Sequence, residues 1–364
     1  MAKTNQLQRK REEYQKLDKR DRRRYWTDGI LNNALYILMF IFIVYTAIKN
    51  KNFLSAGSIA NIISLVAASL PMALGIAGCI VLTGTDLSGG RVVGLTAAVA
   101  GALLQDRTIS RKLFSNLPAI TPGWILLTVL IVVAIGALIG MVNGFFVAKF
   151  SLHPFIVTLA TQLITYGLIL IFFMLNGNNG QPVSGLSQEY KSVVSAPMIQ
   201  FTTGSGAKIS IPWYVLYAVI FVALMWFIWN KTAFGKNMFA VGSNADAAKV
   251  SGVNVFWTTV MVHTLAGAMY GVTGFIEGAR ISSITQSAGL NYECDAIAAC
   301  VIGGVSFNGG IGTVPGVVIG SIILQAINYG LYFLGVNAYL QYIIRGAIII
   351  IAVAIDVQKY VAKK

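Results

Sequence analysis

Long stretches without Asp, Glu, Lys or Arg are the feature of this sequence that most limits its fold. They lie at 29–48, 52–85, 113–148, 150–188, 250–276 and 296–344. A helix that crosses the hydrocarbon core of a bilayer needs about 20 mainly apolar residues, so several stretches hold one such helix and some hold two. Charged residues make up only 11% of the chain, whereas soluble domains average about 25%. The sequence therefore predicts an all-α, polytopic membrane protein.

About ten transmembrane helices fit the apolar stretches. We expect them at 30–48, 58–82, 91–105, 123–147, 154–174, 212–230, 257–276, 291–304, 313–334 and 338–356. The third and the eighth are short, so we expect them to be tilted, broken or re-entrant. Pairs of small residues four apart, such as Gly136 with Gly140 and Gly316 with Gly320, favour close helix packing in lipid.

The distribution of basic residues predicts the orientation. The net charge is +14, and residues 1–28 hold ten Lys and Arg against five acidic residues. If an even number of spans leaves both termini in the cytoplasm, 17 of the 27 Lys and Arg lie inside and 8 outside, as the positive-inside rule predicts. We therefore expect a basic cytoplasmic segment at 1–29, a transmembrane domain at 30–364 and no binding of nucleic acid.

Two long loops, 106–122 and 175–211, then face the outside. The second is rich in Gly, Ser, Asn and Gln, which is typical of a flexible surface. Its alternative role is a docking surface for an extracytoplasmic partner.

Sequence motifs for catalysis and cofactor binding are absent. The three cysteines (Cys79, Cys294 and Cys300) and two histidines show no metal-ligand spacing, and no GxxxxGK[ST] phosphate-binding loop occurs. We therefore expect no catalytic residues, no bound metal and no cofactor in this chain.

The polar segment 230–256 interrupts the apolar interior. Asp246, Ala247 and Ala248 favour a short helix, which Asn244 would cap at its start and Gly252 would close. With the orientation above, this helix lies in the cytoplasm, where its small size suits a groove on another protein.

Polar residues inside the apolar spans are candidates for a translocation path. They are Asn61, Asn143, Gln162, Gln325 and Asn328. Hydrogen bonding between helices is the common alternative role for such groups.

Charged and glycine-rich positions near the membrane form a second set of candidates, for gating or for structure. Glu277 and Arg280, three residues apart, are expected to form a salt bridge on one helix face, with a substrate site as the alternative role. Asp86 is expected either to cap the turn that contains Gly89 and Gly90 or to contact the transported substrate. A similar pair, Gly309 and Gly310, follows a similar apolar segment, which suggests an internal two-fold repeat with Gly-broken segments in both halves.

Three segments together resemble the permeases of carbohydrate ABC importers. They are GTDLSGG at 84–90, TAFGKNMFAVGSNADAAKVSGVNV at 232–255, and EGARISS at 277–283 followed by NYECDAIAACVIGGVSFNGGIGT at 291–313. The forms GTDLSGGRVVGL and YLQYIIRGAIIIIAVAIDVQKY are most similar to the galactose and methyl-galactoside branch of the family. The resemblance covers nearly all of residues 50–364.

This resemblance implies a bacterial inner-membrane permease domain at 30–364 that works as a homodimer. Its partners would be a cytoplasmic ATPase with two fused cassettes, which binds ATP and Mg²⁺, and an extracytoplasmic sugar-binding protein. The family's coupling motif is matched by five residues, so the ATPase would bind the chain there: Asn244, Asp246, Ala247, Ala248 and Gly252. The expected cargo is galactose or methyl galactoside, with ribose or xylose next. A stand-alone, ion-coupled sugar transporter or channel is the alternative function.

Overall fold

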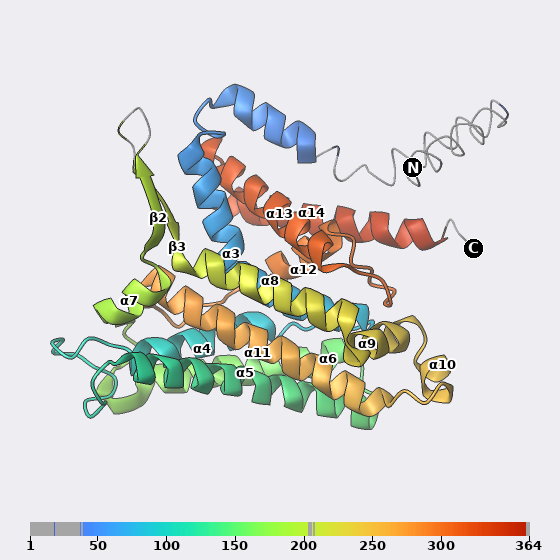
Figure 1. Cartoon of the computed structure of the whole chain (residues 1–364), viewed down its shortest axis with the longest axis horizontal. Coiled ribbons are helices and arrows are strands. Elements are labelled where there is room, and N and C mark those ends of the chain that lie inside the picture. The colour runs from blue at the N-terminus through green and yellow to red at the C-terminus, as the bar shows by residue number, and fades with distance from the viewer. Residues whose placement is uncertain (1–17, 19–36, 38, 203–205, 207, 362–364) are drawn as a thin grey trace.

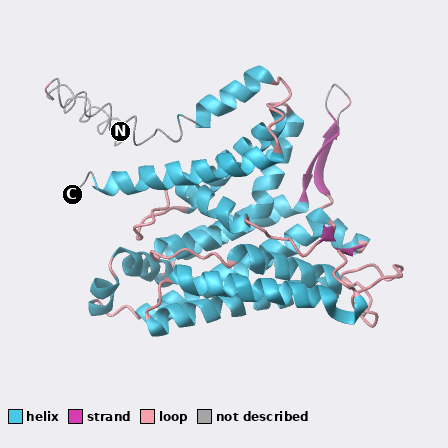
Figure 2. Cartoon of the chain, turned by 180° about the vertical axis from the view of Figure 1, so that it is seen from behind, coloured by secondary structure: helices cyan, strands magenta, loops and turns pink. Residues whose placement is uncertain are grey.

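The computed structural model describes residues 18, 37, 39–202, 206 and 208–361. Predictions for most of the basic segment 1–29, and for the start of the first span, lie outside these residues. The described chain is mainly helical, and its longest helices run side by side (Figures 1 and 2). The helices are Met39–Lys49, α3 (Ala56–Val81), α4 (Gly89–Leu103), α5 (Pro122–Phe150), α6 (Pro154–Met174), α7 (Gln188–Val194), α8 (Trp213–Lys231), α9 (Ala233–Ser243), α10 (Ala245–Val250), α11 (Val255–Ile281), α12 (Tyr292–Ile302), α13 (Val314–Phe333) and α14 (Ala338–Val361), with a 3₁₀ turn η1 (Leu175–Gly177).

Six of the described helices are long and apolar enough to cross a membrane. They are α3, α5, α6 (extended to Gly177), α8, α11 and α13. Each of the other four predicted spans also coincides with a helix, but the apolar part of each is shorter: Met39–Lys49, α4, α12, and Ala338–Ile351 of α14. The structure thus gives a polytopic membrane protein, and the third and eighth predicted spans are short, as expected. Ten crossings and the repeat stay predictions.

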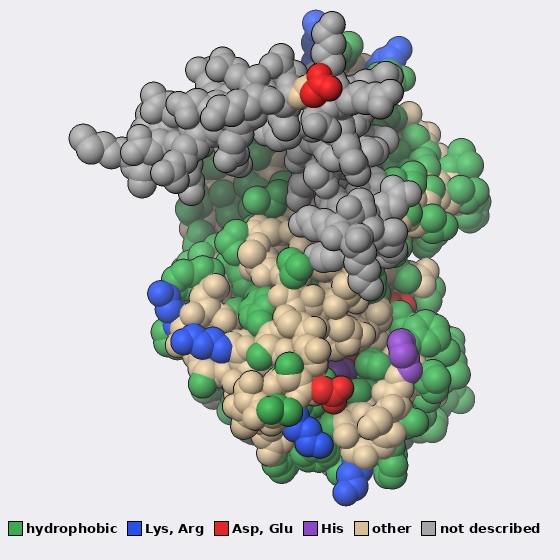
Figure 3. Space-filling model, turned by 90° about the vertical axis from the view of Figure 1, so that its right-hand side faces the viewer, with side chains coloured by type: hydrophobic (Ala, Val, Ile, Leu, Met, Phe, Trp, Pro, Cys, Tyr) green, Lys and Arg blue, Asp and Glu red, His purple; other side chains and the backbone are tan. Residues whose placement is uncertain are grey.

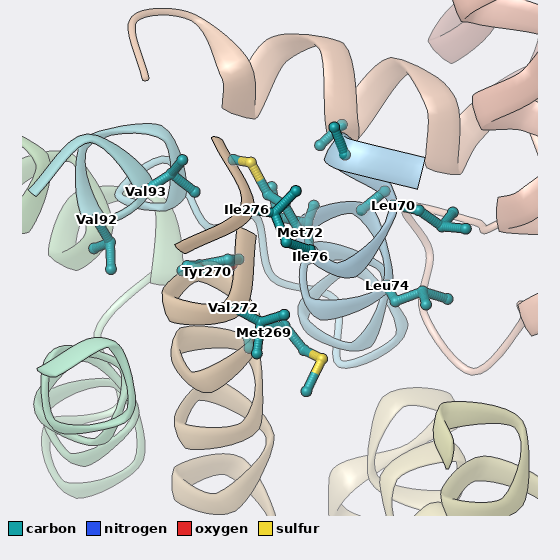
Figure 4. Close-up of a cluster of buried hydrophobic side chains, with 14 of the residues drawn as sticks. Leu70, Met72, Leu74, Ile76, Val92, Val93, Met269, Tyr270, Val272 and Ile276 are labelled. Atoms are coloured by element: carbon teal, nitrogen blue, oxygen red, sulfur yellow. The ribbon is translucent and has the colours of Figure 1, made fainter. Parts of the chain in front are cut away.

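α3 and α11 lie at the centre of the helical bundle. In the most apolar window of α3, 78% of the residues are buried, and in that of α11, 72% are buried; for α6 and α8 the value is 22%. Side chains of α3, α4 and α11 meet in one apolar core, which includes Met72, Val93 and Tyr270 (Figure 4). The outer helices therefore turn large apolar side chains outward, as a lipid surrounding requires.

Glycine allows α5 and α11 to approach closely. A Cβ atom at Gly136 would overlap the carbonyl oxygen of Gly267, and one at Gly140 would overlap that of His263. Likewise, Gly316 and Gly320 lie against the backbone of α12 and of the turn that follows it. These contacts confirm the prediction of close packing through small residues four apart.

The loop 175–211 holds most of the few strands in a mainly helical fold, and its role as a flexible outer surface stays a prediction. It forms α7 and three strands, β1 (Val183–Ser184), β2 (Pro197–Thr202) and β3 (Lys208–Pro212), and β1 pairs with β4 (Ser283–Ile284). Ser187 caps α7, and Tyr190 is buried and donates a hydrogen bond to the carbonyl oxygen of Phe275. The buried ring and this hydrogen bond anchor α7 to α11, within a stretch whose composition alone indicates a loop.

Candidate functional site

The polar segment between α8 and α11 holds two helices, α9 and α10, where the sequence predicted one. Thr232 ends α8 and also begins α9, since its hydroxyl oxygen accepts a hydrogen bond of 3.1 Å from the N–H of Gly235. α9 buries Met238 and Val241 against the bundle. The sequence analysis missed α9, in which Gly235, Lys236 and Asn237 separate the apolar residues at its start from the run Met238–Val241.

α10 has the capping that the sequence predicted. The side-chain oxygen of Asn244 accepts a hydrogen bond of 2.9 Å from the N–H of Ala247. At the other end, the N–H groups of Gly252 and Val253 donate to the carbonyl oxygens of Lys249 and Ala248, each at 3.0 Å. This is the Schellman arrangement, which needs a left-handed residue, and Gly252 has φ of +85°.

α10 has a small exposed surface that combines polar and apolar side chains. Ala248 is buried against the protein, whereas Asp246 and Ala247 are exposed. Val250 is 90% exposed, an apolar side chain without cover at the polar end of the molecule. Val250 was not among the residues predicted from the sequence. Its position could have indicated it, because an apolar residue four positions after Asp246 lies on the same helix face. Several Lys and Arg side chains lie on the face of the molecule that Figure 3 shows. Lys231, Lys236 and Lys249 in the polar segment are exposed, as is Lys149 at the end of α5.

The end of α9 touches the backbone of two distant segments. A Cβ atom at Gly242 would overlap the carbonyl oxygen of Val81, the last residue of α3. The same oxygen accepts a hydrogen bond of 2.8 Å from the N–H of Gly310, in the loop that joins α12 to α13. Gly309 and Gly310 have φ of +77° and +67°, so this loop uses conformations that favour glycine. α9 therefore contacts both the end of α3 and the α12–α13 loop.

Asp86 organises the turn before α4, as predicted. Its Oδ1 atom accepts hydrogen bonds from the N–H and the hydroxyl of Ser88, at 2.9 and 2.6 Å. Its Oδ2 atom accepts a third bond, of 3.0 Å, from the hydroxyl of Tyr270 on α11. Gly89 packs against the Tyr270 ring, and Gly90 lies against Glu293. Asp86 is fully buried, so these bonds stabilise a carboxylate away from water.

Two of the predicted path residues hold helices together. Asn143 is fully buried; it donates to the Ser88 hydroxyl at 3.0 Å and accepts from Thr161 at 2.6 Å. Gln162 donates to Glu293 at 3.2 Å. The contacts of Asn143 tie α5 to α6 and to the start of α4, and that of Gln162 ties α6 to α12. This is the alternative role that the sequence left open.

The other predicted path residues meet at one cavity of about 350 Å³. Gln325 and Asn328 on α13 line it, together with Glu277 and Arg280 of α11. Asn61 lies beside it and donates a hydrogen bond of 3.0 Å to the hydroxyl of Tyr329, another lining residue. The volume is near the lower end of the range for small-molecule sites.

Two ion pairs line this cavity. Arg280 binds both carboxylate oxygens of Glu277, with a shortest distance of 2.8 Å, as the sequence predicted. Arg345 of α14 lies 3.2 Å from Asp295 of α12. The second pair was not predicted, because 50 residues separate its partners and no local pattern joins them. Among the described residues, no group of three or more His, Cys, Asp or Glu could hold a metal ion.

Comparisons with known proteins agree with this architecture. Residues 58–353 match the family model described as "branched-chain amino acid transport system / permease component". The chain is 45% identical to the galactose/methyl galactoside import permease protein MglC of Escherichia coli over 91% of this chain and 95% of the relative. For the protein of that name from Haemophilus influenzae the identity is 43%, over 93% and 97%.

A more distant relative is the ribose import permease protein RbsC of Escherichia coli, 32% identical over 93% of this chain and 97% of the relative. No solved structure matches the chain. The matched family model covers most of the chain, and these relatives align along nearly their whole length. The chain thus belongs to the family of transport-system permease components.

Proposed function

We propose that this chain is the membrane-spanning subunit of an ATP-driven importer for a monosaccharide, with galactose or methyl galactoside as the first candidates and ribose or xylose next. The observation that carries the proposal is the gap in identity between relatives: 45% to the galactose/methyl galactoside permease and 32% to the ribose permease, over nearly equal shares of the chain. Its place would be the bacterial inner membrane, with ten spans and both termini in the cytoplasm.

The ATP-hydrolysing partner would dock on α10. The chain has no phosphate-binding loop of its own, so ATP and Mg²⁺ would be bound by a cytoplasmic ATPase with two fused cassettes. The exposed residues Asp246, Ala247 and Val250 give this partner a small surface on a helix that is capped at both ends. A capped helix moves as a unit, which is what a coupling element needs.

The contact between α9 and the α12–α13 loop supports a route by which a movement of α10 reaches the cavity. A shift of α10 would move α9, and α9 bears on Val81 and Gly310 through backbone contacts. Val81 ends α3, while Gly310 lies between α12 and α13, and all three helices line the cavity.

The opposite end of α8 carries the β2–β3 hairpin and α7 (Figure 1). This end would face outward and receive a sugar-binding protein. We further propose that two copies of the chain form the transport unit. Within each chain, an internal two-fold repeat would relate the Gly-broken segments of the first half to those of the second.

A stand-alone, ion-coupled transporter or channel is the second candidate. The carboxylates at the cavity, Glu277 and Asp295, favour it because such proteins need titrating groups in the membrane. Both carboxylates are paired with arginines, however, and a carrier that works alone has no use for α10.

Co-purification tests the docking proposal. The tagged chain, co-expressed with the tandem-cassette ATPase, should retain the ATPase in mild detergent, and Val250→Asp should weaken this retention. Val193→Asp is the matched control, since Val193 is an exposed valine on α7 at the other end of the molecule. Equal retention by all three proteins would contradict docking on α10.

A further inference from the structure

We propose that the cavity between α3, α11, α12, α13 and α14 is a binding site for one neutral hexose within the membrane domain itself. This inference rests on the proposed sugar transport and adds to it a site with named ligand groups. The wall of the cavity is rich in side chains that form hydrogen bonds with hydroxyl groups: Ser69, Tyr292, Ser321, Gln325, Asn328 and Tyr329.

Two polar atoms at this wall lack partners within the described part of the chain. They are the side-chain oxygen of Asn328, an acceptor, and Nε of Arg345, a donor. Both atoms are shielded from solvent, so bulk water does not replace the missing bonds. A sugar hydroxyl both donates and accepts, so it pairs with either atom once that side chain turns toward the cavity that both residues line.

The charges of the cavity favour a neutral ligand over an ionic one. Its two carboxylates and two guanidinium groups balance, and each is already paired, at 2.8 Å for Glu277 with Arg280 and at 3.2 Å for Asp295 with Arg345. An anion or a zwitterionic amino acid would have to break these pairs to be bound. A hydroxyl uses the remaining lone pairs and N–H groups of the paired side chains, so both pairs stay intact.

Tyrosine rings supply part of the apolar surface of the cavity, beside aliphatic side chains such as Leu65 and Leu324. Tyr292, Tyr329 and Tyr332 line the cavity, and tyrosine combines an apolar ring with a polar hydroxyl. The C–H face of a hexose has the same mixed character. The binding should be weak, because a transported molecule must also leave the site.

Saturation-transfer NMR on the full chain in lipid nanodiscs, without the ATPase or the sugar-binding protein, tests this site. The probes are methyl β-D-galactoside and, as the rival occupant, leucine. We expect saturation transfer to the galactoside, saturable in a titration, and none to leucine. Transfer to leucine alone or to both equally would contradict a site for a neutral hexose.

Substitutions then locate the binding. Asn328→Leu and, independently, Gln325→Leu should weaken galactoside binding by about ten-fold, the loss of one hydrogen bond to a buried polar group. Asn230→Leu, at an exposed position outside the cavity, is the matched control and should bind as the wild type does. Unchanged affinity in both folded cavity variants would overturn the proposal. Co-purification with the ATPase, measured on the same proteins, reports separately on the proposed function.

Discussion

The N–H of Gly310 donates a hydrogen bond of 2.8 Å to the carbonyl oxygen of Val81. This bond joins the α12–α13 loop to the end of α3, and Gly242 of α9 lies against the same carbonyl group. No side chain separates the three segments, so a displacement of α9 reaches both of the others directly. Closely packed backbones transmit such displacements because interiors have low compressibility.

Gly242→Val should uncouple the importer. Its side chain would overlap Val81 and Gly310, and overpacking of this kind costs about 1–3 kcal/mol, so α9 would shift away from the loop. We expect ATP-dependent sugar uptake to be lost while the variant still inserts into the membrane. Uptake by membrane vesicles that hold the co-expressed ATPase, with the binding protein added, measures the effect.

Gly167→Val is the control for that experiment. Gly167 lies on α6, and a Cβ atom there would meet nothing within 4 Å, so uptake should stay at the wild-type level. Normal uptake by Gly242→Val would show that coupling does not pass through this contact.

Gly252→Val should also abolish uptake, for a different reason. A Cβ atom at Gly252 would meet no other atom within 4 Å, but φ is +85°, and the left-handed conformation costs a non-glycine residue about 1–2 kcal/mol. The substitution therefore strains the C-terminal cap of α10 and disturbs the proposed docking surface. Asn tolerates the left-handed conformation, so Gly252→Asn should keep most of the uptake. Gly177→Val is the control. Gly177 also has a positive φ, of +72°, and no atom within 4 Å of a Cβ there, but it lies in η1, directly after α6 and outside the polar segment 230–256. Full uptake by Gly252→Val would refute the coupling role.

Asp86→Asn should destabilise the fold through the turn before α4. The buried carboxylate accepts three hydrogen bonds through its two oxygens. Asn keeps only one acceptor oxygen, so at least one bond is lost, and a hydrogen bond to a charged group contributes roughly 1.5–3 kcal/mol. Tyr270→Phe removes one of these bonds and should cost less. Thermal unfolding in nanodiscs, followed by the circular dichroism of the helices, gives the order of the midpoints.

Asp106→Asn is the matched control for Asp86→Asn. Asp106 accepts bonds of 2.8 and 2.7 Å from the N–H and hydroxyl of Thr108, in the same turn geometry but at the surface. These bonds lower the pKa of the Asp106 carboxyl below its usual value. Because water replaces lost bonds there, its midpoint should change little; a shift as large as that of Asp86→Asn would contradict the importance of burial.

The orientation of the chain can be tested by labelling of single cysteines. Lys249→Cys, on α10, and Glu189→Cys, on α7, place exposed thiols at opposite ends of the molecule. In intact cells whose outer envelope is permeable, a membrane-impermeant maleimide should label only Glu189→Cys, and disruption of the inner membrane should expose Lys249→Cys. The native Cys79 and Cys300 are buried and Cys294 should be replaced by Ser. Labelling in the reverse order would overturn a cytoplasmic α10.

The sequence predicted best those features that depend on local chemistry. Uncharged stretches gave the positions of the helices, Asn244 and Gly252 gave the caps of α10, and the spacing of Glu277 and Arg280 gave their salt bridge. Features that depend on tertiary packing were missed. The pair of Asp295 with Arg345 joins different helices, and α7 contacts α11 through the buried Tyr190.

The candidate path was predicted only in part for the same reason. A polar residue in an apolar span either bonds to another helix or faces a cavity, and one sequence does not distinguish the two. Asn143 found partners on other segments, whereas Asn328 lines the cavity.

Reconstituted uptake tests the central claim most directly. Proteoliposomes would contain this chain and the tandem-cassette ATPase, with ATP inside and radiolabelled galactose outside. We predict accumulation that requires ATP and added sugar-binding protein and that persists in the presence of a protonophore. Accumulation without the ATPase that a protonophore abolishes would contradict the account and favour an ion-coupled transporter.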